Sequence, residues 1–102
     1  MWCYFYVLQS QKDLNWFYKG VTYNLEHRLD KHNDGLVLST KSHAPFILVY
    51  YEAYLNELAA KLRERGVKKS GSVWMPLMKR VKASLNYKKA PVKSRLRKSC
   101  KY

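Results

Sequence analysis

Two polar side chains, Arg28 and His32, fall on the apolar side of a helix that the sequence predicts to begin at Leu25. At about 100° per residue, Leu25, Leu29 and Leu36 share one narrow stripe. Arg28 and His32 project from that side, one turn apart. Because a buried guanidinium is costly without a partner, this side borders either an internal carboxylate or a cleft that holds an anion. Alternatively, Arg28 lies at the edge of the core and extends its guanidinium to water, and His32 is a core histidine whose ring is hydrogen-bonded.

Two tyrosines bring further polar groups toward the same region. Tyr6 lies in an aromatic and β-branched run at residues 2–8, and Tyr18 lies in a second run at 16–21. Phenol and imidazole groups can pass protons, and a guanidinium can bind a phosphate through two N–H donors. The four polar side chains could therefore converge over one sheet face as a phosphate-handling site. Core tyrosines with satisfied hydroxyl groups are the alternative.

The elements that must position these groups form the order β–β–α–β–α–α. The predicted strands cover residues 2–8, 16–21 and 46–54, and the predicted helices run from 25 to near 34, over 55–65 and over 74–85. Asn24 caps the first helix and Gly35 ends it. This order predicts an α+β fold, a small and mainly antiparallel three-stranded sheet flanked by helices. At 102 residues the chain has room for one domain, which we expect over 1–85, followed by a basic tail at 86–102.

The second predicted helix carries the last acidic residue of the chain, Glu64. Leu55, Leu58 and Leu62 repeat at helical spacing and predict the buried face of this helix, which we expect to end at Gly66. Glu64 lies about 180° from that stripe, so periodicity makes it a surface acid. The small side chain of Ala60, one turn earlier on the Glu64 side, offers another way for the helix to approach the sheet.

The net charge of +13 is distributed very unevenly. Residues 1–64 hold seven Lys or Arg and seven Asp or Glu, whereas residues 65–102 hold thirteen basic residues and no acid. This division favours a polyanionic partner, first nucleic acid and second an anionic lipid surface. No run approaches the roughly 20 apolar residues that cross a bilayer, and the short apolar start predicts a strand rather than a signal peptide. With only two cysteines, we expect a cytoplasmic protein without a disulfide scaffold.

These residues also carry a resemblance to a known family. The pieces are Tyr4-Phe5-Tyr6, Tyr18-Lys19-Gly20, Asn24 to Leu29 with His32 and Gly35, Ser39 to Ser42 with Pro45-Phe46, and Leu48 to Glu52 with Ala60 to Glu64. In this order and spacing the chain resembles the GIY-YIG nuclease family. More narrowly, it resembles the small stand-alone bacterial members that are related to the nuclease domain of the nucleotide-excision-repair protein UvrC. Tyr4-Phe5 replaces the Gly-Ile of the first motif, and Lys19 replaces an aliphatic residue of the second.

The resemblance implies an endonuclease that hydrolyses DNA phosphodiester bonds. Because the sequence shows no element with specific side chains for reading bases in a groove, we expect nonspecific or structure-selective action, the latter of the repair or recombination type. It implies that Tyr6 and Tyr18 are the motif tyrosines, one of which helps to deprotonate the attacking water. Arg28 would hold the scissile phosphate, and His32 would transfer a proton or donate a hydrogen bond nearby. Glu64 would bind one divalent metal ion, Mg²⁺ or Mn²⁺. These roles, together with a glycine at position 20 for close backbone approach, are expectations from the resemblance.

The basic residues beyond the catalytic set are expected to bind the nucleic-acid backbone. They are Lys41, Lys68, Lys69, Lys79, Arg80, Lys82, Lys88 and Lys89. RNA is an alternative partner to DNA, because a basic segment neutralises either backbone. A second hypothesis is a nucleic-acid-binding adaptor of the same fold that has lost turnover.

Overall fold

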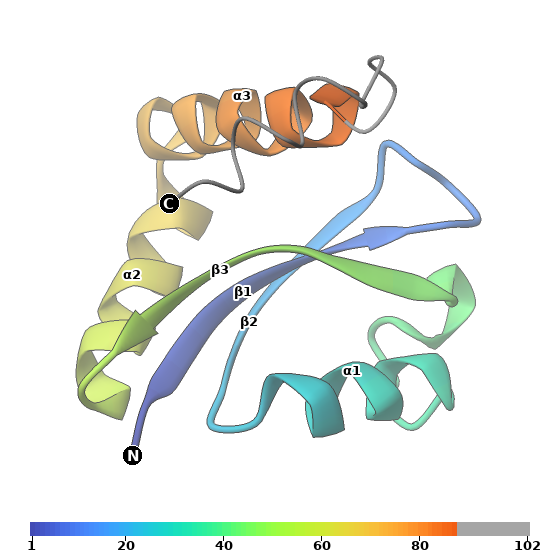
Figure 1. The fold of residues 1–102 in the computed structure, drawn as a ribbon, viewed down its shortest axis with the longest axis horizontal. Coiled ribbons are helices and arrows are strands. Elements are labelled where there is room, and N and C mark those ends of the chain that lie inside the picture. Colours follow the sequence, from blue (N-terminus) through green and yellow to red (C-terminus); the bar gives the residue numbers. More distant parts are fainter. Residues whose placement is uncertain (88–102) are drawn as a thin grey trace, which may run out of the picture.

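The computed structural model describes residues 1–87, and these residues form a three-stranded sheet with helices on both faces (Figure 1). The predicted Lys88 and Lys89 contacts and most of the predicted tail lie outside the described residues. The strands are β1 (Cys3–Ser10), β2 (Phe17–Thr22) and β3 (Phe46–Tyr54), and the helices are α1 (Leu25–Asn33), the 3₁₀ turn η1 (Lys41–His43), α2 (Glu57–Lys69) and α3 (Gly71–Tyr87). The strand order is β2-β1-β3 with both pairs antiparallel. The predicted α+β fold and element order are confirmed.

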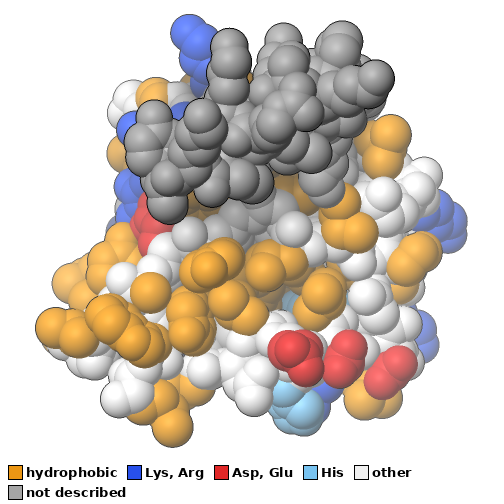
Figure 2. Space-filling view, in the orientation of Figure 1, with side chains coloured by type: hydrophobic (Ala, Val, Ile, Leu, Met, Phe, Trp, Pro, Cys, Tyr) orange, Lys and Arg blue, Asp and Glu red, His pale blue; other side chains and the backbone are white. Residues whose placement is uncertain are grey.

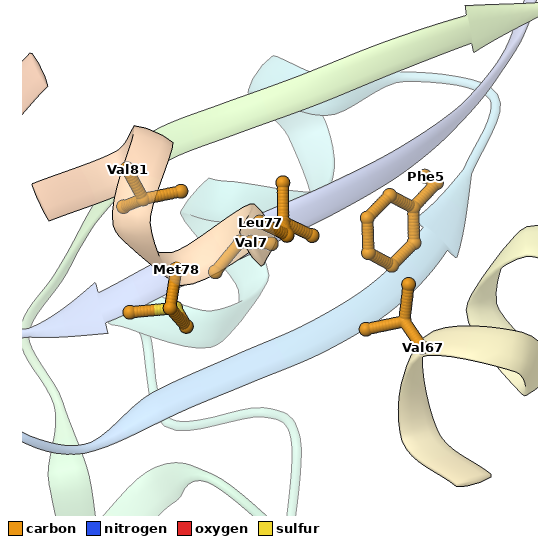
Figure 3. Packing of buried hydrophobic residues seen from close by; sticks show 6 residues of the cluster. All are labelled: Phe5, Val7, Val67, Leu77, Met78 and Val81. Atoms are coloured by element: carbon orange, nitrogen blue, oxygen red, sulfur yellow. The ribbon is translucent and has the colours of Figure 1, made fainter. Parts of the chain in front are cut away.

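The two faces of the sheet are covered by different helices. One face packs against α2 and α3 through Phe5 and Val7 of β1, which contact Val67, Leu77 and Val81 (Figure 3). The opposite face carries Tyr6 and Leu8 and packs against α1. Because side chains alternate along a strand, β1 supplies both cores. A polar group on the α1 face is therefore separated from the main hydrophobic core by the sheet itself.

The first helix forms where the sequence predicts it. The side chain of Asn24 accepts a hydrogen bond from the backbone N–H of His27, at 3.0 Å, and so caps the helix. His32 is fully buried beneath the helix, as its position on the apolar side predicts. The prediction for Leu36 is wrong, because the helix has already ended and this side chain is 68% exposed.

The second helix is turned away from the predicted orientation. Leu55, Leu58 and Leu62, the predicted core stripe, are 78%, 67% and 52% exposed. Ala60 and Val67 are buried instead. Figure 2 shows hydrophobic side chains at the surface around the start of α2 and the N-terminus. The face of α2 that packs on the sheet is therefore the face that carries Ala60 and Glu64.

A polar contact between α2 and β3 helps to set this orientation. Arg63 donates two hydrogen bonds to the carboxylate of Glu52, at 3.0 and 3.1 Å, and Tyr50 and Tyr54 donate to the same carboxylate. Burial alone would raise the pKa of Glu52, but the hydrogen bonds from Arg63 and the two tyrosines bring it below its ordinary value. This contact fixes the side of α2 that carries Arg63 against β3, and burial of Ala60 and Val67 on the sheet acts in the same direction.

The predicted end of α2 at Gly66 is also wrong. The helix continues to Lys69, and only Ser70 separates it from α3, so the predicted linker around residues 68–72 is mostly helical. A Cβ atom built at Gly66 meets nothing within 4 Å. Glycine in a helix interior weakens the helix but does not forbid it, and packing of Val67 against Phe5 supplies the missing stability.

The orientation of α2 can be tested by two substitutions on opposite faces. Val67→Ala is expected to lower the free energy of unfolding by about 2 kcal/mol, because it opens a cavity against Phe5. Leu62→Gln, on the predicted but exposed stripe, is expected to change it by no more than about 0.5 kcal/mol. Urea unfolding followed by circular dichroism measures both values. The reverse ranking would show that the leucines, and not Val67, face the core.

Candidate active site

Four of the sequence-predicted site residues meet on the α1 face of the sheet. Tyr6 comes from β1, Tyr18 from the neighbouring edge strand β2, and Arg28 and His32 from α1. The ring centroids of Tyr6 and Tyr18 lie 6.3 Å apart, and the Tyr18 ring lies 5.0 Å from that of His32. Antiparallel pairing of β1 with β2 and the turn into α1 bring these side chains together, as strand alternation predicts.

The hydroxyl group of Tyr6 is the point where these side chains converge. It lies 3.0 Å from Nε2 of His32, and Nε of Arg28 donates to it at 3.4 Å. Tyr6 is 2% exposed, and burial raises the pKa of its phenol to about 12 despite the opposing hydrogen bond from Arg28. The phenol therefore stays protonated at neutral pH and acts as a fixed hydrogen-bonding group.

A hydrogen-bond chain fixes the tautomer of His32. Its Nδ1 lies 2.7 Å from Oγ1 of Thr40, and that hydroxyl group can donate to the carbonyl oxygen of Val37 at 3.4 Å. The Thr40 oxygen then accepts from Nδ1–H, which leaves Nε2 to accept from the Tyr6 hydroxyl. Burial, and then the charge of Arg28, lowers the pKa of His32 to about 4. His32 is thus a neutral acceptor that orients Tyr6.

Thr40 and Asn33 support the site, and neither was assigned a role from the sequence. Thr40 is fully buried beside His32. Asn33, at the end of α1, accepts a hydrogen bond from the backbone N–H of Phe46 and donates one to its carbonyl oxygen, at 2.6 and 3.1 Å. This double contact ties α1 to β3 and so fixes the height of His32 above the sheet. A buried histidine requires a partner at Nδ1, and that requirement is the one signal in the sequence that points to a nearby hydroxyl group.

His32 should make the stability of the fold depend on pH. Its pKa of about 4 in the folded state lies below the ordinary 6.5, so its contribution is complete above pH 6.5 and is lost as the pH falls toward 4. The shift corresponds to on the order of 3 kcal/mol. We expect the free energy of unfolding to fall over this window, and to fall much less in His32→Gln. His27→Gln, on the exposed side of α1, is the control and should retain the full pH dependence.

Glu64 lies on α2, which packs on the opposite face of the sheet from the other four residues, and among residues 1–87 no hydrogen bond or ion pair joins it to them. Its side chain is 23% exposed and accepts from Lys68, one turn later, at 3.1 Å. Its charge acts on Tyr6 and adds to the raised pKa there, although burial is the main cause of that shift. Periodicity alone makes Glu64 a surface acid, whereas its side chain is largely covered in the structure, on the side of α2 that packs on the sheet. Helix α2 approaches the sheet by the side that carries Ala60, and this residue is fully buried.

The donor set around Glu64 allows a metal ion with few protein ligands. Among residues 1–87 there is no group of three or more His, Cys, Asp or Glu side chains placed to hold an ion together. A single inward carboxylate fits Mg²⁺ or Mn²⁺, which keep several water and phosphate ligands. Lys68, which pairs with Glu64, is 47% exposed and has room to move aside.

Gly20 lies directly opposite Tyr6 in the β1–β2 register. A Cβ atom at this position would lie 2.5 Å from the Tyr6 oxygen and 2.6 Å from its Cζ atom. The Tyr6 ring thus crosses the backbone of β2 on its way to His32 and Arg28. The close approach expected at Gly20 is made by the tyrosine side chain.

Six of the predicted backbone-binding residues lie among residues 1–87, where they are exposed but divided between two regions. Lys68 and Lys69 end α2, and Lys79, Arg80 and Lys82 lie on α3. Lys41 stands apart in η1, beside α1. The outer side of α1 carries a row of acids, Glu26, Asp30 and Asp34, which is visible in Figure 2. A polyanion is therefore favoured on the α2 and α3 side and repelled from the outer side of α1. In the part of the chain that the structure describes, no helix is long and apolar enough to cross a membrane.

Comparisons with known proteins show the family to which the chain belongs. Residues 2–74 match the GIY-YIG catalytic domain. The chain is 37% identical over 67 residues to a UPF0213 protein of Clostridium perfringens, covering 65% of this chain and 70% of that protein. It also resembles the solution structure of a UPF0213 protein of Bacillus halodurans, with a TM-score of 0.47 and 28% identity over 78% of this chain and 84% of that one. Domains of this kind are usually endonucleases and typically use a divalent metal ion. With the match covering Tyr6 through Glu64, the chain belongs to the GIY-YIG family.

Proposed function

We propose that this protein is a metal-dependent endonuclease that hydrolyses DNA phosphodiester bonds with selectivity for branched or otherwise irregular DNA. The observation that carries the proposal is that Arg28 and His32 both hydrogen-bond the hydroxyl group of Tyr6, with the ring of Tyr18 beside that of Tyr6. An arginine with spare donors, near the half-buried phenol of Tyr18, suits a phosphate whose oxygens gain charge during the reaction.

Arg28 is placed to bind the scissile phosphate. Its guanidinium has five N–H donors, and the bond from Nε to Tyr6 uses one of them. That bond is the main reason why the pKa of Arg28 lies above its ordinary value, and it holds the planar head group in place. The remaining donors can bind two phosphate oxygens, an interaction that strengthens as negative charge develops on them.

The two tyrosines take different roles. Tyr6 is buried and protonated, so it positions Arg28 and cannot reach the solvent. Tyr18 is half-buried at the edge strand, and its phenol assists removal of the proton from the attacking water. His32, being neutral and already accepting from Tyr6, has a hydrogen-bonding role and transfers no proton in the reaction.

Glu64 would hold one Mg²⁺ or Mn²⁺ ion, which supplies positive charge for the phosphate and the leaving oxygen. The chain contributes the inward orientation of that carboxylate, set by packing of Ala60 and Val67 against the sheet. The basic residues of α2 and α3 then hold the nucleic-acid backbone near the site.

The proposal is tested by incubating the full chain with supercoiled plasmid, flap DNA, branched DNA and structured RNA, in Mg²⁺, in Mn²⁺ and in EDTA. Cleavage of DNA that requires the metal supports the proposal, and a preference for flap or branched DNA supports the selectivity. Salt-sensitive binding without cleavage in any metal would instead identify a nucleic-acid-binding adaptor. Faster cleavage of RNA than of every DNA would overturn the substrate assignment.

A further inference from the structure

A second concave site lies on the opposite face of β2 from the catalytic residues. It is a cleft of about 330 Å³ between the β2 edge and α3, within the size range of small-ligand pockets. The residues that matter in its lining are Phe17 and Lys19 from β2 and Trp74, Met75, Met78 and Lys82 from α3. Its walls are thus mainly aromatic and thioether groups, together with Asn15 and two ammonium groups, and among the described residues no acid lines it.

Lys19 is held in this cleft by an aromatic ring. Its Nζ lies 4.0 Å from the centroid of the Trp74 ring, a favourable cation–π distance. Within residues 1–87 Lys19 takes part in no ion pair. Partial burial, and then the charge of Lys68, lowers its pKa. A partly buried ammonium group that faces another cation rather than an acid is stabilised by an anion from outside.

The cleft is close to the proposed catalytic site by chain geometry. Tyr18 and Lys19 are neighbours on β2 and project to opposite faces. Since β2 is an edge strand, a single strand of nucleic acid can pass from one face to the other around that edge. Lys68 donates a hydrogen bond to Glu64, and its charge also contributes to the lowered pKa of Lys19.

We propose that this cleft is a subsite for one unpaired nucleotide, with the base against Trp74 and Met75 and a phosphate at Lys19 and Lys82. The proposal extends the proposed function, because it assigns to the endonuclease a substrate with an unpaired strand next to the cleaved bond. Stacking on an aromatic side chain tolerates any base, and ammonium groups bind a phosphate regardless of sequence. The subsite therefore selects single-stranded character rather than sequence.

The test measures binding without cleavage. In EDTA, fluorescence anisotropy compares a labelled single strand of thymidines with a strand of equal length and charge that has abasic sites at its centre. The wild type should bind the base-containing strand about tenfold more tightly. Trp74→Leu, which keeps an apolar side chain in the core, should reduce this ratio to about one. Trp2→Leu removes a tryptophan that is 51% exposed at the N-terminus and should leave the ratio unchanged.

Two further variants keep the test decisive if Trp74→Leu is unstable. Met75 is 65% exposed, so Met75→Ser should fold normally and reduce the ratio by about threefold. Lys19→Met should weaken both strands equally and reduce the salt slope of binding by about 0.7, the loss of one phosphate contact to a single strand. Equal wild-type binding of both strands, or an unchanged ratio in folded Trp74→Leu and Met75→Ser, would overturn the subsite.

The outcome is separable from that of the nuclease proposal. A base preference in EDTA without cleavage in Mg²⁺ would leave the subsite standing and remove the enzymatic activity. Cleavage in Mg²⁺ with no base preference in EDTA would do the opposite.

Discussion

Glu64→Gln is expected to reduce metal-dependent cleavage about a thousandfold while the fold stays intact. Glutamine keeps the size of the side chain but lacks the negative charge that binds a divalent ion. The charge that a metal ion supplies to a phosphate is worth several kcal/mol, and each 1.4 kcal/mol is a factor of ten in rate. The other acid of α2, Glu57, lies two turns earlier and accepts a hydrogen bond from Tyr23, so no neighbouring carboxylate on this helix can replace Glu64.

Glu57 on the same helix provides a matched control. It too pairs with the lysine four residues later, Lys61, at 2.8 Å, but its side chain is 45% exposed and it hydrogen-bonds Tyr23 rather than facing the site. Glu57→Gln should change the cleavage rate by less than about twofold, although it removes an equivalent surface ion pair. Cleavage rates in a Mg²⁺ titration and far-UV circular dichroism distinguish the cases. Equal rates for wild type and a folded Glu64→Gln would remove this residue from the proposed metal site.

The Glu64 position shows why part of the fold could not be predicted from the sequence. Helix caps, turn residues and strand alternation are local signals, and they placed α1 and β3 at their observed positions. Which face of α2 meets the sheet depends on contacts with distant residues, above all that of Arg63 with Glu52. A leucine stripe favours burial, yet the observed buried face combines Ala60 and Val67 with the Arg63 contact to Glu52, and none of these partners can be read from the periodicity of the helix.

The candidate site, like the fold, could be predicted from the sequence only in part. Alternation in β1 and β2 and the helical position of Arg28 and His32 were enough to expect one cluster, because each signal is local. The partner of His32 could not be predicted in this way, because Thr40 comes from the segment between α1 and η1, where the sequence has no helical or strand periodicity. The cleft beside Trp74 could not be predicted from the sequence either, because it arises from the packing of α3 against an edge strand.

Gly20→Ala is expected to lower both stability and activity, because it adds one methyl group beneath Tyr6. The new Cβ would lie 2.5 Å from the Tyr6 oxygen, well inside van der Waals contact. Tyr6 cannot yield easily, since it is buried and its hydroxyl group is held by His32 and Arg28. Overpacking of this kind costs about 1–3 kcal/mol, and any relaxation must move the hydroxyl group away from its partners.

The effect on activity follows from that displacement. If Tyr6 shifts, Arg28 loses the contact that fixes its guanidinium, and a misplacement of about 1 Å can cost on the order of a hundredfold in rate. Gly66→Ala is the matched control, because a Cβ atom there meets nothing within 4 Å in the interior of α2. Alanine should stabilise that helix by about 0.5–1 kcal/mol and leave cleavage unchanged. Urea unfolding and cleavage rates of both variants test the pair. A Gly20→Ala protein as stable and active as wild type would show that the Tyr6 ring is free to move, and that Arg28 does not depend on it for its position.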